Sequence, residues 1–174
     1  YKEIPGSKGL VILDALKTNN VVWKNSGTTL YDVGDEILNL EFHTKMNTMG
    51  AEVIEGINKA ISVAEKNYKG LVIGNEGDNF SAGANLGMLF MLAGNREFDE
   101  ISLSVQAFQN TMMRARYSSI PVVVATSGLT LGGGIELSMH ADQVRAHTET
   151  YMGLVEFGVG IIPSGGGTKE MTLR

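Results

Sequence analysis

Apolar residues recur at two spacings along the chain, and these spacings predict alternating strands and helices. Short runs rich in β-branched and aromatic residues at 21–24, 28–34 and 37–42 predict three strands, because Asn, Ser, Gly and Asp turn signals separate them. Residues 50–67 carry apolar side chains three and four positions apart, which predicts an amphipathic helix. Residues 100–117 repeat that spacing and predict a second helix.

Further apolar runs follow each of these helices. Residues 70–74 and 121–125 predict short strands that are buried on both faces, and 141–146 and 150–153 predict two more short strands. The order strand, helix, strand, helix, strand is typical of an α/β layered domain. We expect residues 1–20 to be a lead-in or linker packed at an edge of this domain, which begins at residue 21.

An excess of glycine changes this picture. The 174 residues include 22 glycines and only 3 prolines, whereas ordinary glycine usage is roughly 7%. Many of these glycines lie in three segments that each follow a predicted strand, at 79–86, 128–136 and 158–168. Glycine loses much backbone entropy on folding, so the clusters indicate backbone that turns sharply or lies close to a ligand. For any single cluster, a tight turn or close packing is the alternative explanation.

Charge and composition exclude several classes of function. Cysteine is absent, which excludes disulfides and thiolate sites, and the net charge of −5 argues against a nucleic-acid partner. The uncharged runs at 79–95 and 117–135 contain glycine and polar residues, so we expect no membrane span. The three histidines lack metal-ligand spacing and predict no metal site. The first residues hold no apolar signal segment, and we expect a cytoplasmic protein.

Two carboxylates lie close to the glycine clusters. Glu136 follows the triplet 132–134 in the first turn of an expected helix, and Glu156 lies 20 residues further on. Apolar surroundings would raise the pKa of such carboxyls and suit them to proton transfer near neutral pH. The alternatives are a helix-start glutamate and an exposed loop glutamate. Free N–H groups at a glycine-rich helix start can bind an oxyanion or a phosphate, but the standard nucleotide-binding motifs do not occur.

Together these segments resemble the crotonase family, the enoyl-CoA hydratases and isomerases. The motifs that carry the resemblance are Ser81-Ala82-Gly83-Ala84-Asn85, Leu131-Gly132-Gly133-Gly134-Ile135-Glu136-Leu137, and Gly153-Leu154-Val155-Glu156 with Pro163 and Gly166-Gly167-Thr168. The chain is most similar to the hydratase-like segment of bacterial fused 3-hydroxyacyl-CoA dehydrogenases, through 67–75, 108–114 and 141–156. The resemblance implies an α/β crotonase (ClpP-like) fold of repeated ββα units. Because the family domain continues through several C-terminal helices, we expect residues 21–174 to be that domain with these helices missing.

The resemblance also implies roles for individual residues. The N–H groups of Ala84 and Gly133 would form an oxyanion hole for the thioester carbonyl. Glu136 would orient and activate water, and Glu156 would exchange the proton at the α-carbon. Asn85 stands where the family often has Asp, with little effect expected on the hole. The residues implied to bind substrate or its CoA moiety are Lys45, Met46, Asn47, Ser81, Ala82, Gly83, Asn85, Leu86, Gly132, Gly158 and Pro163.

From this resemblance we expect an enoyl-CoA hydratase segment of a 3-hydroxyacyl-CoA dehydrogenase that acts in fatty-acid β-oxidation. Enoyl-CoA isomerisation, another CoA-thioester reaction and a non-catalytic structural module remain the alternatives. The expected partners are an acyl-CoA substrate and either further copies of the chain or a dehydrogenase domain of the same polypeptide. We expect no cofactor for this segment, because CoA is part of the substrate; NAD would serve the dehydrogenase domain.

Overall fold

A six-stranded sheet forms the centre of the molecule, in the order β1-β2-β3-β4-β5-β7. The computed structural model describes residues 12–16 and 19–173. The first three strands pair antiparallel, and β3, β4, β5 and β7 then run parallel to one another. The strands are β1 (Val21–Lys24), β2 (Thr28–Gly34), β3 (Ile37–Phe42), β4 (Gly70–Gly74), β5 (Val122–Thr126) and β7 (Gln143–Ala146).

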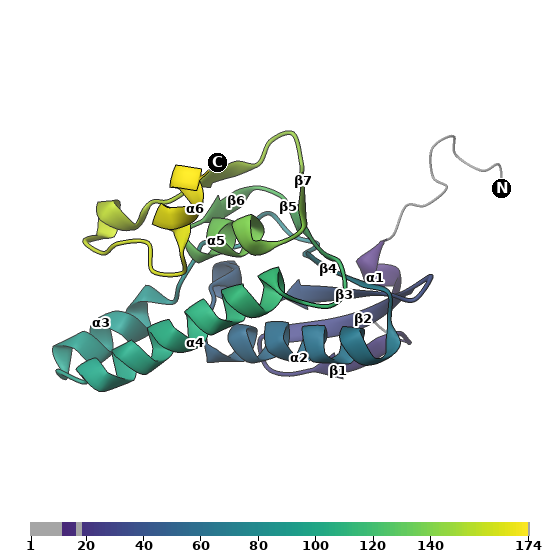
Figure 1. Cartoon of the computed structure of the whole chain (residues 1–174), viewed down its shortest axis with the longest axis horizontal. Coiled ribbons are helices and arrows are strands. Elements are labelled where there is room, and N and C mark those ends of the chain that lie inside the picture. The colour runs from purple at the N-terminus through teal and green to yellow at the C-terminus, as the bar shows by residue number, and fades with distance from the viewer. Residues whose placement is uncertain (1–11, 17–18, 174) are drawn as a thin grey trace.

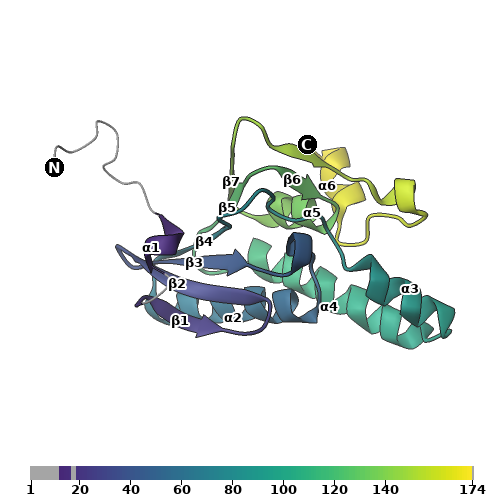
Figure 2. The same cartoon turned by 180° about the vertical axis from the view of Figure 1, so that it is seen from behind.

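Two long helices cover one face of this sheet (Figures 1 and 2). They are α2 (Ala51–Asn67) and α4 (Phe98–Arg116), so both predicted helices are confirmed within two residues at each end. The face of α2 that carries Ile57 and Ile61 is fully buried, as is Leu40 on β3. Because the apolar stripe of an amphipathic helix must be covered, it packs on the sheet and forms the main core there.

A second, two-stranded sheet lies above the first and consists of β6 (Leu129–Leu131) and β8 (Tyr151–Gly153). The chain therefore follows a ββα order in β5-β6-α5, where α5 is Gly133–His140, and approaches it again in β7-β8 with η2 (Glu156–Val159) and α6 (Gly167–Leu173). This arrangement agrees with the expected repeat. The short strand β6 was not expected, because it lies inside a glycine-rich segment whose turn signals conceal three strand residues.

The strands predicted at 21–24, 28–34, 37–42 and 70–74 are confirmed at both ends, and β5, β7 and β8 differ from their predicted bounds by one or two residues. β5 begins at 122 instead of 121, because Pro121 has no N–H to donate to a sheet ladder. β7 begins at 143 instead of 141, since the carboxylate of Asp142 accepts the Val122 N–H at 2.8 Å and the chain bends there. The predicted strand at 150–153 begins at Tyr151.

Three short helices complete the fold. A 3-10 turn, η1 (Lys45–Asn47), precedes α2, and α3 (Leu86–Gly94) packs beside α4 as a projection from one side of the molecule (Figure 1). Within the predicted lead-in, α1 (Leu13–Leu16) packs near β2 with Leu13 buried, and residues 1–11 and 17–18 lie outside the described part of the chain. No helix of the described residues is long and apolar enough to span a membrane.

Candidate active site

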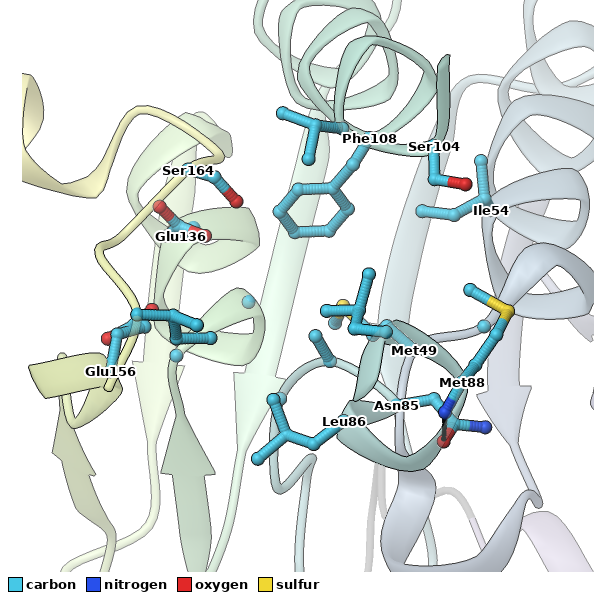
Figure 3. Close-up of a pocket in the computed structure, with 18 of the residues that line it drawn as sticks. Met49, Ile54, Asn85, Leu86, Met88, Ser104, Phe108, Glu136, Glu156 and Ser164 are labelled. Carbon is cyan, nitrogen blue, oxygen red and sulfur yellow. Dashed lines mark hydrogen bonds between the residues drawn. The ribbon is translucent and has the colours of Figure 1, made fainter. Parts of the chain in front are cut away.

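A cavity of about 510 Å³ opens beside the helix α5, and its two walls differ in character. Figure 3 shows Glu136, Glu156 and Ser164 on one side, and Met49, Leu86 and Met88 on the other. The residues that line this cavity are Met49, Gly50, Ala51, Ile54, Glu55, Ala82, Gly83, Ala84, Asn85, Leu86, Met88, Leu89, Ser104, Val105, Ala107, Phe108, Gly132, Gly133, Glu136, Val155, Glu156, Val159, Ile161, Ile162 and Ser164. A mostly apolar cavity with a few convergent polar groups is typical of a small-molecule site.

Two backbone N–H groups hold the Glu136 carboxylate in place. It lies in the first turn of α5 and is 1% exposed, and its Oε1 accepts the N–H groups of Gly165 and Gly167 at 2.8 Å each. Burial raises the pKa of this carboxyl, and the charge of Glu156 adds to that rise, although the two N–H hydrogen bonds oppose it. A raised carboxyl pKa suits Glu136 to proton transfer near neutral pH.

Glu156 is the second carboxylate of the cavity and has a different setting. It begins η2 and is 8% exposed, so the exposed-loop alternative is wrong. Its Oε2 is buried and has no hydrogen-bond partner among the described residues. A Cβ atom on Gly132 would lie 3.1 Å from its Oε1, so a glycine at 132 leaves room for this carboxylate. One oxygen of Glu156 therefore has its hydrogen-bonding capacity unused by the described residues.

Two free backbone N–H groups lie near these carboxylates. Neither Ala84 nor Gly133 donates its N–H to another described residue. The segment before Ala84 is fixed by the hydrogen bond from Met49 N–H to Gly83 O at 2.8 Å. A Cβ on Gly83 would lie 3.5 Å from the Gly133 nitrogen, so the two segments are in close contact. Positive φ angles of 93° at Gly83 and 50° at Gly132 allow this approach.

The opposite wall consists of apolar side chains from three helices. Phe108 extends from α4 into the cavity, with its ring directed away from Ile54 (Figure 3). A Cβ on Gly133 would lie 2.9 Å from Phe108 Cζ, so the ring rests on the first residue of α5. The sequence placed Phe108 on an apolar helix face and in the stretch 108–114, and Ser164 in the glycine-rich segment 158–168, but it did not predict Phe108, Ser104 or Ser164 as site residues. Phe108 and Ser104 lie far in sequence from the glycine motifs, which explains why they were missed. Ser164 lies beside Gly165, but its residue type alone does not mark it as a site residue.

The predicted site residues divide into two groups. Those that the structure brings to the cavity are Ala82, Gly83, Ala84, Asn85, Leu86, Gly132, Gly133, Glu136 and Glu156. Those that do not line it are Lys45, Met46, Asn47, Ser81, Gly158 and Pro163. Among the second group, Ser81 shapes the site indirectly, because its Oγ donates to Asn47 O at 2.7 Å and accepts the Gly83 N–H at 3.1 Å.

Several other predicted residues have positions that the structure defines. Asn85 is the N-cap of α3, where its Oδ1 accepts the Met88 N–H at 3.4 Å. Gly158 is exposed on η2, whereas Pro163 is buried. Gly165 and Gly167 were noted as part of a glycine cluster but not as partners of Glu136. In the part of the chain that the structure describes, no three acidic or histidine side chains are placed to hold a metal ion.

Comparison with known proteins identifies related sequences. The sequence model of the enoyl-CoA hydratase/isomerase family matches residues 34–173. A probable 3-hydroxyacyl-CoA dehydrogenase of Bacillus subtilis is 49% identical over the whole chain, which spans 22% of that protein. A putative fatty acid oxidation complex trifunctional enzyme of Rickettsia felis is 34% identical, and the chain spans 24% of it. The chain thus covers about a quarter or less of these two relatives.

Solved structures show the same fold. An enoyl-CoA hydratase from Polaromonas sp. JS666 superposes with a TM-score of 0.77 at 28% identity, over 84% of this chain and 58% of that one. An enoyl-CoA hydratase from Bacillus anthracis gives a TM-score of 0.76 at 24% identity, over 85% of this chain and 58% of that one. The expected crotonase fold is therefore confirmed.

Proposed function

The chain belongs to the enoyl-CoA hydratase/isomerase family, and from that premise we propose that it adds water to the 2,3 double bond of 2-enoyl-CoA thioesters. The observation that carries the proposal is the meeting of two buried carboxylates and two free backbone N–H groups in one cavity. Hydration of an enoyl thioester can use all four groups. The N–H pair stabilises charge on the thioester oxygen, and the carboxylates handle the two protons.

The reaction follows from this arrangement. The thioester oxygen accepts hydrogen bonds from the N–H groups of Ala84 and Gly133, which polarises the conjugated double bond. Ionised Glu136 takes a proton from a water molecule as its oxygen bonds to C3, and the electron pair of the double bond moves to the thioester oxygen as an enolate. Protonated Glu156 then gives its proton to C2 as the enolate collapses. Transfer of the proton from Glu136 to Glu156, directly or through solvent, restores both groups.

The expected contributions are large enough to matter. An oxyanion-hole donor typically lowers a barrier by about 3–4 kcal/mol, and general acid–base help contributes about 10²–10⁴-fold. The donors here are backbone groups held by the sheet contacts of 83–85 and by the start of α5, so little reorganisation is needed when charge develops. The buried setting strengthens these interactions because water does not screen them.

We further propose that the chain is the hydratase-like part of a longer polypeptide that also carries 3-hydroxyacyl-CoA dehydrogenase activity. The 49% identity over the whole chain to a much longer Bacillus subtilis protein supports this proposal. The chemistry supports it too, because hydration of a 2-enoyl-CoA yields a 3-hydroxyacyl-CoA, which is the substrate of such a dehydrogenase. The apolar wall around Phe108 would receive the acyl chain.

Product analysis tests the reaction. The protein is given a 2-enoyl-CoA and, separately, the 3-enoyl isomer, and the products are separated by chromatography. We expect 3-hydroxyacyl-CoA from the 2-enoyl substrate. Conversion of the 3-enoyl isomer alone would indicate an isomerase, and free CoA would indicate thioester hydrolysis; either result would overturn the proposed hydration. With NAD added, NADH should form only in the polypeptide that carries the dehydrogenase part.

A further inference from the structure

A second cluster of charged and polar side chains lies next to Glu136, and its members Arg116, His140 and Glu170 do not line the cavity. Glu170, in the first turn of α6, has a side chain only 3% exposed. Its Oε2 accepts a hydrogen bond from Arg116, the last residue of α4, at 2.6 Å, and its Oε1 lies 2.8 Å from Lys169 Nζ. This ion pair ties the start of α6 to the end of α4.

The ring of His140 fills the space between this ion pair and the site. Its Nδ1 lies 2.8 Å from the backbone oxygen of Glu136, and its Nε2 is 3.9 Å from Glu170 Oε1. Burial lowers the pKa of His140, which outweighs the opposing effects of the Glu136 carbonyl and Glu170. The ring is therefore neutral near pH 7, and Nδ1 carries its hydrogen because a carbonyl oxygen can only accept.

The same ring supports the backbone that holds Glu136. A Cβ on Gly166 would lie 3.1 Å from His140 Cε1, so this peptide rests against the imidazole edge. Gly166 lies between Gly165 and Gly167, whose N–H groups donate to Glu136 Oε1 at 2.8 Å. Glu170 also donates its own backbone N–H to Gly166 O at 3.0 Å. A continuous set of contacts thus connects Arg116 to the carboxylate of Glu136.

We propose that Arg116 and Glu170 are positioning residues for Glu136: their ion pair, with the His140 ring, fixes the 165–167 backbone so that two N–H groups point at the Glu136 carboxylate. The proposal rests on the proposed catalytic role of Glu136 for its functional meaning, but its geometric claim concerns the protein alone. Loss of the pair would loosen the 165–167 peptides, weaken the two hydrogen bonds, and move the Glu136 carboxyl further towards its neutral form.

The chain contains a matched control for this proposal. Arg114, two residues earlier on α4, makes a bidentate ion pair with Glu65 of α2. Its side chain is 34% exposed, against 27% for Arg116. The Glu65 carboxylate of this pair also accepts the Ser119 N–H, and none of the hydrogen bonds described for the pair goes to 165–167. Arg114→Met and Arg116→Met therefore remove the same charge from the same helix, but only the second reaches the site.

The test measures the Glu136 carboxyl directly. The infrared band of the protonated Glu136 carboxyl is identified by its absence in Glu136→Gln. The intensity of this band is then followed against pH in the unsubstituted protein and in Arg116→Met, Glu170→Gln and Arg114→Met. The charge of Glu156, on η2, also affects the titration of Glu136, and the charge of Lys169 affects that of His140. All the variants retain Glu156 and Lys169. Urea unfolding of each variant reports how far the fold itself is weakened.

The sign of the shift separates positioning from simple charge effects. Positioning predicts that both Arg116→Met and Glu170→Gln raise the Glu136 midpoint, by about one pH unit if one hydrogen bond to a charged group is largely lost. A direct charge effect predicts opposite shifts, because one variant removes a positive charge and the other a negative one. Opposite shifts, or midpoints equal to that of Arg114→Met, would overturn the proposal.

Activity supplies the second readout and keeps the two proposals apart. If the protein hydrates 2-enoyl-CoA, the acid limb of the plot of kcat/KM against pH should shift to higher pH in Arg116→Met and Glu170→Gln. The shift should equal that of the infrared midpoint, with KM changed less than about twofold. If the protein lacks hydratase activity, the proposed function fails, yet the infrared midpoints still decide whether Arg116 and Glu170 position Glu136. If activity is present but neither profile nor midpoint moves, only the positioning proposal fails.

Discussion

The sheet region and the site region of this molecule are built from opposite properties of the chain. In the sheet region, β2, β3, β4 and α2 bury large side chains such as Leu40 and Ile57 completely. In the site region, between 128 and 167, the decisive feature is the lack of a side chain. A Cβ on Gly165 or Gly167 would meet the Glu136 carboxylate within 3 Å. The core thus depends on volume, and the site depends on exposed backbone.

This difference explains the glycine excess. At Gly128, with φ of 53°, a Cβ would overlap the backbone oxygen of Asp78. At Gly134 it would lie 3.1 Å from Ser81 Cβ, which would push apart the two segments that meet at the cavity. Backbone N–H groups can reach a ligand or a carboxylate only when nothing covers them. The hydrogen bonds that these exposed N–H groups make therefore offset part of the backbone entropy that glycine loses on folding.

The largest expected effect separates the two regions by activity. Glu136→Gln and Glu156→Gln should each lower hydration of 2-enoyl-CoA by about 10²–10⁴-fold, because each removes one proton-transfer group. Glutamine retains the size of glutamate and an oxygen that can accept the Gly165 and Gly167 N–H groups, so folding should persist. Steady-state rates and acyl-CoA binding by calorimetry measure both effects. Unchanged turnover in both variants would contradict the assigned roles.

A substitution in the core of the sheet region should lower the stability of the fold and leave the rate of the reaction nearly unchanged. Leu40→Ala removes a fully buried side chain from β3 and should lower the free energy of unfolding by about 2–5 kcal/mol. Urea unfolding measures this loss, and the rate per folded molecule should change little. Exposed Leu173→Ala, 73% exposed, is the control that should leave stability nearly unchanged. A large loss of turnover in folded Leu40→Ala would break the separation between the regions.

A smaller effect concerns the pH dependence of stability at the site. Because burial raises the pKa of Glu136 in the folded protein, its contribution to stability is fully present below its ordinary pKa of 4.5. That contribution is lost as pH rises through the higher folded pKa. Stability relative to Glu136→Gln should therefore fall over the pH range just above 4.5, as followed by urea unfolding of both proteins. A difference that rises with pH would contradict the buried setting.

The smallest effect has the opposite sign and lies in the helical layer. The Arg114 side chain, together with the Ser119 N–H, lowers the pKa of Glu65 to about 2. The stability from this pair is present above 4.5 and should be lost as pH falls from 4.5 towards 2. We expect only about 1 kcal/mol, because both side chains are partly exposed and solvent screens them. Acid unfolding of the unsubstituted protein and of Arg114→Met measures this effect. The variant has no ion pair to lose, so its free energy of unfolding should fall less between pH 4.5 and 2.

The sequence predicts the sheet region better than the site, for a physical reason. Apolar spacing gave the bounds of α2 and β4 nearly to the residue, because burial repeats with the period of the element. Motifs placed Glu136 and Glu156 near glycine, but no periodicity relates Phe108 or Gly167 to them. Phe108 joins the cavity, and Gly167 reaches the Glu136 carboxylate, through tertiary packing of α4 and α6, which local patterns do not encode. The strand β6 was hidden for a different reason, because glycine turn signals flank its three residues.

In the proposed reaction, the bare backbone N–H groups of Ala84 and Gly133 polarise a thioester carbonyl. Raman difference spectroscopy of a 2-enoyl-CoA with a ¹³C-labelled thioester carbonyl, bound to Glu156→Gln to slow turnover, tests it most directly. We predict that the carbonyl stretch moves to lower frequency on binding, because two N–H donors weaken the C=O bond. A bound substrate whose carbonyl frequency equals that in water would show that these N–H groups do not polarise it.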